Sequence, residues 1–313
     1  MFRLVKYFIK QTLIAFFVKN EKYILQKQIV KNDKILEKIE FEFNEEEFII
    51  FLKSCFIENT QTYVSTIIDT FNQGVVDSCS HSKYKELGIN LDNIKILCLK
   101  DYSIFIGLYE LNTFQKEMKK FNVDFIFSPY LLIDIHKSKT KNSIYILITD
   151  SFVVVLIYED GIKPKYSNIY QFKIDEENTL ENDSVDDTLS EDIENIDLVD
   201  DIEELDDIED LDEDIESSLD DMDEVNIDNN ENIDDIVEVK NEIETLDFIK
   251  NSIKDYYENY SDNFLEYGYL FYDTEISNKL ISNIENETFL EIKSEKIDIL
   301  SAINELALKE IDV

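Results

Sequence analysis

Short runs of apolar and β-branched residues, separated by polar clusters typical of turns, predict two groups of three strands. In the second group, the cluster before the third strand contains Asp160-Gly161, in which glycine supplies the positive φ of a hairpin turn. Each group is expected to form an antiparallel meander. The runs are Leu13–Val18, Tyr23–Val30 and Ile35–Phe43 in the first group, and Ile144–Ile148, Phe152–Tyr158 and Tyr166–Phe172 in the second.

Helical periodicity follows each meander. Asn44 and the three Glu residues after it predict a helix N-terminus, because Asn caps free amides through its side-chain oxygen and acidic residues interact favourably with the helix dipole. After a long polar stretch, order is expected to resume near Leu246 with a helix of 3.6-residue period. The other expected elements are strands at 63–69, 94–99, 125–127, 267–271 and 289–292, and helices at 113–121, 276–284 and 297–308. This alternation indicates an α/β fold with mixed sheets.

Half of the acidic residues lie in one stretch. Residues 175–247 hold 35 of the 70 Asp and Glu residues and one base, Lys240, which gives a net charge of −34 out of −40. Such a segment cannot bury enough apolar surface to fold, so residues 175–246 are expected to be a long disordered acidic insertion. We predict that residues 1–138 form a first half, and that residues 139–174 and 247–313 together form a second half around the insertion.

Part of this insertion has a helical pattern. Leu211, Ile215, Leu219 and Met222 are spaced by 4, 4 and 3 residues, which places them on one helical face. A protein partner could fold this piece on binding, and the alternative is a solvated spacer. In a third interpretation the tract captures basic protein segments, as a nucleic-acid mimic or chaperone. Binding of nucleic acid itself is not expected, because no basic patch offsets the charge of −40.

Glycine and cysteine usage excludes several kinds of site. The five glycines never lie closer than 14 positions apart, whereas phosphate-binding loops need clustered glycines. The three cysteines, Cys55, Cys79 and Cys98, are odd in number and fit no zinc spacing, so we expect reduced core thiols of a cytosolic protein. Cys79-Ser80-His81 is interpreted as ordinary packing rather than a metal or nucleophile site. No metal ligand or catalytic residue is assigned.

The N-terminal residues offer one hint of a membrane. No apolar run reaches the ~18–20 residues of a membrane span. On a helix, Arg3, Lys6 and Lys10 would share a face opposite apolar residues, as in interfacial anchors. The alternative is a helix packed on the core. We therefore expect a cytoplasmic protein, and peripheral association with the inner face of the cytoplasmic membrane is a further hypothesis.

Two halves that each open with a meander and continue through helices and strands resemble the actin-like, ribonuclease H-like fold. The segment IYILITDSFVVVLIYEDGIKPKYSNIYQF resembles the strands and hairpin of PilM and GspL, proteins of bacterial type IV pilus and type II secretion machines. LDFIKNSIKDYYENY is similar to the helix before the penultimate strand of that family. YGYLFYDTEISNKLISNIENETFLEI and IDILSAINELALKE resemble its last elements. The resemblance spans most of the residues outside the insertion.

The resemblance also indicates a degenerate nucleotide site. Catalytic members of the superfamily have Asp and Gly in the two turns that meet phosphate and metal, whereas this protein has Lys-Asn-Glu at 19–21 and Thr-Asp-Ser at 149–151. Asp150 alone could approach a magnesium ion, and otherwise it is an ordinary turn residue. Asp273-Thr274 stands where the family has a glycine pair. No cofactor is expected, and ATP with magnesium remains the alternative.

From this resemblance we expect a non-enzymatic scaffold or assembly component of an inner-membrane type IV pilus, type II secretion or transformation machine. Its relatives bind the cytoplasmic tail of an inner-membrane protein and contact an assembly ATPase, which are the partners expected here. Basic protein segments are expected to meet the acidic tract. The alternative function is an actin-like ATPase with an unconventional nucleotide site.

Overall fold

The computed structural model describes residues 10–172, except 20, 33, 59 and 60, and residues 233–311. The protein divides into two compact units, Met1–Phe172 with Val239–Val313, and Lys173–Glu238. Of the second unit, only the start of helix α6 is described. The candidate partner-binding residues Leu211, Ile215, Leu219 and Met222 lie outside the described residues, as do Arg3 and Lys6.

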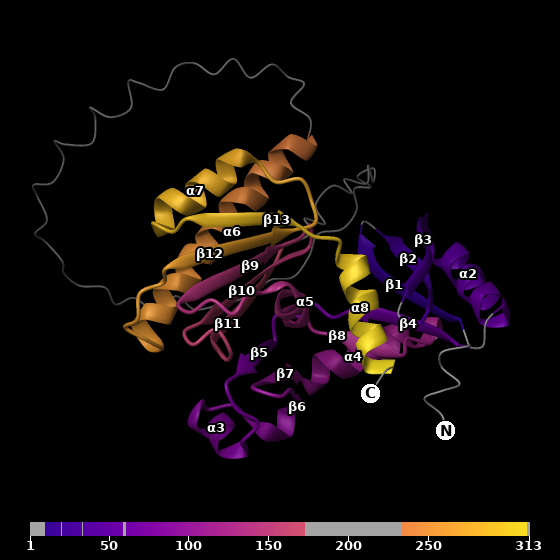
Figure 1. Cartoon of the computed structure of the whole chain (residues 1–313), viewed down its shortest axis with the longest axis horizontal. Coiled ribbons are helices and arrows are strands. Elements are labelled where there is room, and N and C mark those ends of the chain that lie inside the picture. The colour runs from indigo at the N-terminus through magenta and orange to yellow at the C-terminus, as the bar shows by residue number, and fades with distance from the viewer. Residues whose placement is uncertain (1–9, 20, 33, 59–60, 173–232, 312–313) are drawn as a thin grey trace, which may run out of the picture. The chain divides into compact units, whose positions relative to one another are not determined.

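Two five-stranded sheets with the same topology form the framework of the first unit (Figure 1). The strand orders are β3-β2-β1-β4-β8 and β11-β10-β9-β12-β13. In each sheet the first strand lies in the middle, antiparallel to the second and parallel to the fourth. The strands are β1 Gln11–Lys19, β2 Lys22–Lys31, β3 Lys34–Phe43, β4 Thr62–Ile67, β8 Phe125–Phe127, β9 Ser143–Ile148, β10 Phe152–Tyr158, β11 Pro164–Gln171, β12 Tyr267–Tyr272 and β13 Ile292–Lys296.

Two helices lie between the sheets, and others cover their outer faces (Figure 1). Residues of α5 and α8 share one apolar cluster with Ala15 of β1 and Leu147 of β9. The alternate residues of these strands face two further clusters, one under α2 and the other under α6 and α7. The helices are α2 Glu45–Glu58, α3 His81–Glu86, α4 Leu108–Met118, α5 Pro129–His136, α6 Ile233–Asn259, α7 Asn278–Thr288 and α8 Ile299–Ile311, with 3₁₀ turns at Leu91–Asn93 and Lys119–Phe121.

Helix α8 packs on the first half, although in the sequence it follows β13, the last strand of the second half. It packs on β1 and β4. Its Asn304 side chain donates a hydrogen bond to the carbonyl of Gln26 in β2 at 3.2 Å. Asp298, just before α8, forms an ion pair with Lys38 of β3 at 2.6 Å. The two halves therefore share one interior.

A small third sheet was not fully expected from the sequence. Its order is β5-β7-β6, with β5 Gln73–Val76, β6 Ile94–Cys98 and β7 Ser103–Gly107. Only β6 was predicted as a strand. Both other strands are short and include a glycine, Gly74 or Gly107, which weakens a strand pattern. This sheet lies in the sequence between β4 and β8, so it is an insertion in the first half.

Several boundaries differ from those expected, among them the start of the helix predicted at 113–121, which is α4 at Leu108–Met118. Helix α6 begins at Ile233, well before Leu246. The strand predicted at 289–292 is wrong, because Phe289 ends α7 in the left-handed conformation with φ 58° and is 93% exposed. β13 instead begins at Ile292. An apolar residue at a helix end was mistaken for the start of a strand.

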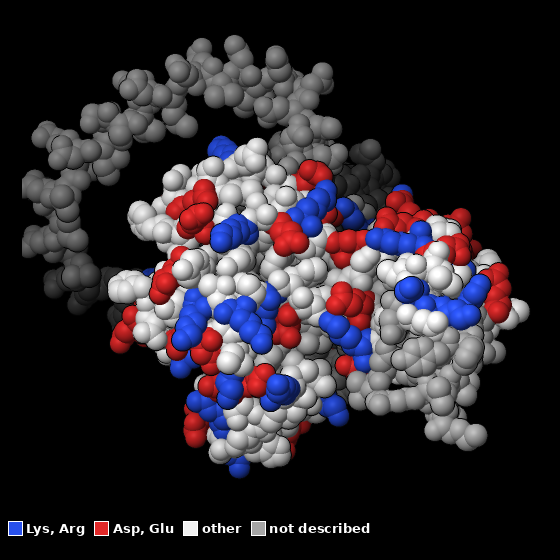
Figure 2. All heavy atoms as spheres, in the orientation of Figure 1, with Lys and Arg blue, Asp and Glu red and all other residues white. Residues whose placement is uncertain are grey.

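Outside the acidic stretch, acidic and basic side chains are nearly balanced in number. On the face shown in Figure 2, the two kinds are interspersed over the described part of the molecule. The described residues on this face therefore form no large patch of one sign.

Candidate functional site

The cleft between the two halves contains Asp150, the weak cofactor candidate. Asp150 lies in the tight turn between β9 and β10, where the Thr149 hydroxyl accepts hydrogen bonds from the amides of Ser151 (3.1 Å) and Phe152 (3.0 Å). This side-chain turn orders the loop without glycine. The carboxylate of Asp150 forms an ion pair with Lys19 at the end of β1. The ammonium group of Lys19 therefore pairs with the carboxylate that the sequence analysis considered as a magnesium ligand.

Two further carboxylates line the same cavity, which has a volume of about 170 Å³. Asp69 follows β4 and Asp273 follows β12, so each comes just after a parallel strand of its sheet. In open α/β sheets, ligands bind at the carboxyl ends of strands, and this rule was the signal that could have found both residues. From the sequence, Asp273 was recognised only as a departure from the family, and Asp69 was missed.

Burial changes the acidity of this cleft. It raises the pKa of Asp69 above its usual range. It also raises the pKa of Asp273 to about 7, with the nearby charge of Asp150 adding to the effect and Lys19 and Lys296 opposing it. One oxygen of Asp273 is buried without a hydrogen-bond partner. The raised pKa of Asp273 favours its protonated form, because two carboxylates in one site resist ionising together.

The chemistry available to the cleft is narrow. Among the described residues, no three His, Cys, Asp or Glu side chains are grouped closely enough to hold a metal ion. The cavity is smaller than the ~300–1,000 Å³ typical of ligand pockets. Neither turn at its mouth contains a glycine that would let backbone amides approach a phosphate.

A larger hollow, which the sequence did not predict, lies between the small sheet and the first large sheet. Two cavities of about 570 and 860 Å³ adjoin there and share Leu97 of β6, Ile126 of β8 and Asp124. We call them together the β6–β8 groove. In the part of the protein that the structure describes, β6 pairs only with β7 and β8 pairs only with β4. Both walls of the groove therefore include an edge strand with unpaired backbone groups.

Mainly apolar side chains line this groove. The 570 Å³ cavity is walled by Ile96, Ile104 and Ile106 of the small sheet and by Leu111 and Met118 of α4. Lys95 and Lys119 also line it, and its one acidic side chain, Asp124, accepts a hydrogen bond from the amide of Val64 at 2.9 Å. The groove thus offers an apolar surface, free strand edges and a slight excess of positive charge in this part.

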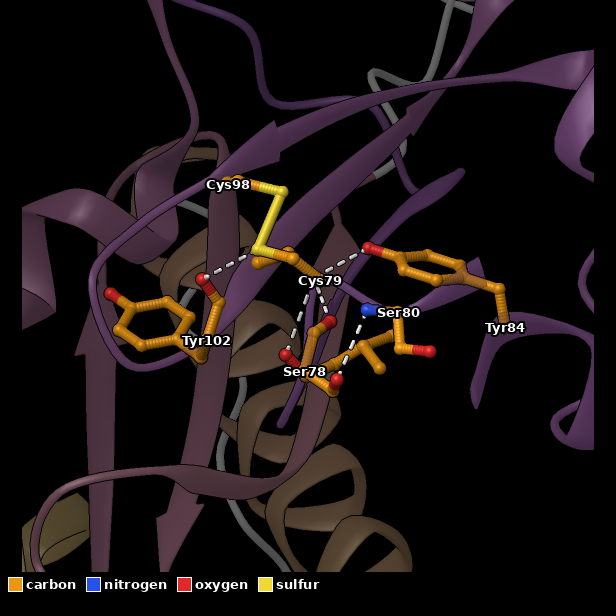
Figure 3. Close-up of a disulfide and its surroundings, with 8 residues drawn as sticks. Ser78, Cys79, Ser80, Tyr84, Cys98 and Tyr102 are labelled. Atoms are coloured by element: carbon orange, nitrogen blue, oxygen red, sulfur yellow. Dashed lines mark hydrogen bonds between the residues drawn. A yellow bond between two sulfur atoms is a disulfide. The ribbon is translucent and has the colours of Figure 1, made fainter. Parts of the chain in front are cut away.

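The prediction of three reduced core thiols was wrong. Cys79 and Cys98 form a disulfide at one end of the small sheet (Figure 3). Both residues are exposed. Cys55 alone is a free, buried thiol. His81 begins α3 next to this disulfide. The pairing was missed because the two cysteines lie 19 positions apart, one in a loop and one at the end of a strand, and give no local spacing pattern.

Lys10 is the one membrane-surface candidate that the structure describes, and it is exposed just before β1. None of the described helices has the length and apolar character needed to cross a membrane.

These features define the class of the protein, which has an actin-like fold with mixed α/β sheets. Among solved structures, the chain is similar to PilM in the PilM–PilN type IV pilus biogenesis complex, with a TM-score of 0.50, 8% identity, and coverage of 93% of this chain and 89% of that one. It also matches a Bacteroides thetaiotaomicron protein with actin-like ATPase fold and unknown function (TM-score 0.47, 12% identity, 97% of each chain). A third match is the ethanolamine utilization protein EutJ from Carboxydothermus hydrogenoformans (TM-score 0.41, 5% identity, 94% and 87%). At these identities the likeness concerns the fold alone.

Family models match both halves of the sequence. Residues 8–134 match a domain of unknown function, DUF8569, and residues 144–312 match a domain of unknown function, DUF8341. Since the second match spans more than half of the sequence, the protein belongs to the DUF8341 family. No curated protein matches the sequence.

Proposed function

We propose that this protein is a non-enzymatic scaffold that binds an extended segment of a protein partner in the β6–β8 groove. The observation that carries the proposal is the presence of two edge strands along an apolar groove. An extended peptide adds to such an edge through main-chain hydrogen bonds, and its alternate side chains then enter the pockets beneath. PilM, whose fold this protein shares, is in its solved structure in a complex with PilN.

The partner segment that suits this groove is short, extended and rich in apolar residues. The exposed Leu97 side chain and the half-buried Ile126 give it apolar contacts on both walls. Lys95 and Lys119 favour an acidic residue or a free terminal carboxylate at one end. In this proposal the segment is a cytoplasmic tail of an inner-membrane protein, and it would attach the scaffold to a pilus, secretion or transformation machine at the inner face of the cytoplasmic membrane.

The proposal is tested with synthetic peptides that copy the cytoplasmic tails of inner-membrane proteins from the same genome. Their binding to the full-length protein is measured by fluorescence anisotropy. Leu97→Glu places a charge in the groove and is expected to weaken binding at least about tenfold. Leu87→Glu is the matched control, because Leu87 is 45% exposed against 51% for Leu97 and lies at the end of α3, outside the groove.

Backbone chemistry sharpens this test. N-methylation of a peptide at alternate residues removes the amides that would pair with a strand edge. One alternating set is expected to abolish binding and the other to leave it nearly unchanged. Equal binding by both methylated peptides, or by the Leu97→Glu protein, would contradict strand addition in this groove.

An actin-like ATPase is the second candidate, and the convergence of Asp69, Asp150 and Asp273 on one cavity favours it. It is tested by calorimetry with ATP and magnesium, with and without residues 175–232, a deletion that leaves helix α6 intact. The scaffold proposal expects no heat of binding in either form. Magnesium-dependent binding that disappears in Asp150→Ala would establish the ATPase candidate instead.

The acidic tract and the N-terminus enter this proposal as accessory elements. The tract, with Leu211, Ile215, Leu219 and Met222, would capture basic partner segments and raise their association rate. Arg3, Lys6 and Lys10 would hold the scaffold near anionic lipid. Deletion of residues 175–232, which leaves helix α6 intact, should then reduce the salt dependence of partner binding, and deletion of residues 1–10 should reduce flotation with anionic vesicles.

A further inference from the structure

The disulfide between Cys79 and Cys98 spans the central strand of the small sheet. Cys79 lies in the loop after β5, and Cys98 is the last residue of β6. Between them lies Ser103, the first residue of β7, which pairs with Cys98 on one side and with Val76 of β5 on the other. The disulfide therefore ties the two outer strands of this sheet together at one end (Figure 3).

Both sulfur-bearing residues are exposed, whereas the contact beneath them is buried. The hydroxyls of Tyr84 and Ser103 lie 2.6 Å apart, and both residues are fully buried. The Ser103 hydroxyl also donates a hydrogen bond to the carbonyl of Ser78 at 2.5 Å. The loop that carries Cys79 thus has an anchor of its own. Opening the disulfide leaves this anchor in place, and the exposure of both cysteine residues favours attack by a soluble thiol.

The disulfide contributes more to the position of strand β6 than to that of the loop that carries Cys79. Within the described residues its ladder hydrogen bonds reach only β7, and Lys95, Ile96 and Leu97 form a wall of the β6–β8 groove. The turn that follows, residues 99–102, lines the second cavity of the groove. The disulfide bond at Cys98 therefore restrains the point where strand β6 meets the turn at residues 99–102. When the bond is reduced, the end of this edge strand can fray.

We propose that Cys79–Cys98 is a thiol–disulfide exchange site whose reduction loosens β6 and thereby weakens binding in the groove. The part of this proposal that concerns binding in the groove rests on the proposed function. The co-substrate is a protein or small-molecule dithiol. One of its thiolates attacks a sulfur of the pair and forms a mixed disulfide while the other cysteine leaves as a thiolate. The second thiol of the co-substrate then displaces the remaining cysteine, so two electrons and two protons pass from the dithiol to the pair. A low-molecular-weight disulfide restores the bond by the reverse exchange.

The experiment compares the full-length protein after treatment with a disulfide reagent and after treatment with a dithiol. Titratable thiols in the denatured protein are expected to rise from one, Cys55, to three. Hydrogen exchange at the amides of β6 is expected to become about tenfold faster on reduction, because a constraint on an edge strand is lost. Exchange in β9 and β10, whose residues are all buried, should not change.

Variants separate this effect from general damage by the reagents. Cys79→Ser with Cys98→Ser should show the fast β6 exchange under both treatments. Cys55→Ser is the matched control and should respond as the native protein does. Three titratable thiols after oxidation, or the same β6 exchange in both states, would overturn the proposal. Exchange that responds to redox state while no tail peptide binds in either state would contradict the proposed function and leave the exchange site standing.

Discussion

The two large sheets have the same strand order but are buried to different degrees. In the second sheet every residue of β9 and β10 is buried, whereas in the first sheet no residue of the edge strand β3 is. Both sheets have helices on both faces of their central strands, but every residue of β3 in the first sheet is at least partly exposed. The same topology therefore has fully buried strands, β9 and β10, in the second half and an exposed edge strand, β3, in the first. The small sheet and the β6–β8 groove both belong to the open half.

The largest expected effect compares two leucines. Leu156→Ala in β10 deletes a fully buried side chain and should lower the free energy of unfolding by about 2–5 kcal/mol. Leu36→Ala in β3, where the side chain is 55% exposed, should change it by about 0.5 kcal/mol or less. Urea unfolding of both variants measures the difference. Equal losses would mean that β3 is covered in solution.

The next effect concerns the pH dependence of the cleft. Because the pKa of Asp273 is about 7 in the folded protein and near 3.8 in the unfolded state, the folded state binds more protons between these values. Asp273 therefore costs stability progressively as pH rises from about 4 to about 7, and this cost persists at higher pH. Asp273→Asn should be more stable than the native protein by about 1–3 kcal/mol at pH 8. The two proteins should converge near pH 4.

Thermal unfolding of both proteins across this pH range tests the expectation. Asp262→Asn provides a matched control at an exposed position, and it should show no comparable pH-dependent gain. A gain for Asp273→Asn that is the same at pH 4 and pH 8 would point to packing rather than to ionisation.

Helix caps should have similar effects in both halves. The Asn44 side chain accepts a hydrogen bond from the amide of Glu47 (3.0 Å), and Glu47 accepts one from the amide of Asn44 (3.1 Å), which is a capping box at the start of α2. Ser277 caps α7 by accepting from the amide of Leu280 (3.0 Å). Asn44→Ala and Ser277→Ala should each cost about 1 kcal/mol in urea unfolding. A large difference between the two losses in free energy of unfolding would show that the two halves differ in their helices as well as in their strands.

The smallest expected effect is at the link between the halves. Lys19 and Asp150 form an ion pair whose side chains are 42% and 38% exposed. A double-mutant cycle with Lys19→Ala and Asp150→Ala should give a coupling below about 1 kcal/mol that decreases with salt. A larger coupling, insensitive to salt, would show that the cleft is drier than its exposure indicates.

The sequence predicted elements best where burial is symmetric. Apolar runs such as Phe152–Tyr158 were recognised because a strand covered on both faces has no polar alternation. The repeat of two meanders led to the correct fold. Short strands with glycine, such as β7, and the eight-residue helix α5 with Pro129 at its first position were missed because their patterns are too brief to distinguish from loops.

The candidate site was less accessible to prediction. Asp150 could be proposed because its turn is local, whereas Asp69 was missed because only the sheet brings it to the same cavity. The groove depends on the distance between two edge strands, and the disulfide depends on the ends of three strands. Neither feature has a signature within one segment of the sequence.

Helix α8 has a consequence for the order in which the molecule can form during synthesis. Its residues cover a face of the first sheet, although about 255 residues separate α8 from the end of β3. Until α8 has left the ribosome, β1 and β4 have an apolar face without this cover. The half that is made first is therefore completed last, and in the growing polypeptide it would depend on chaperones to protect that face from aggregation.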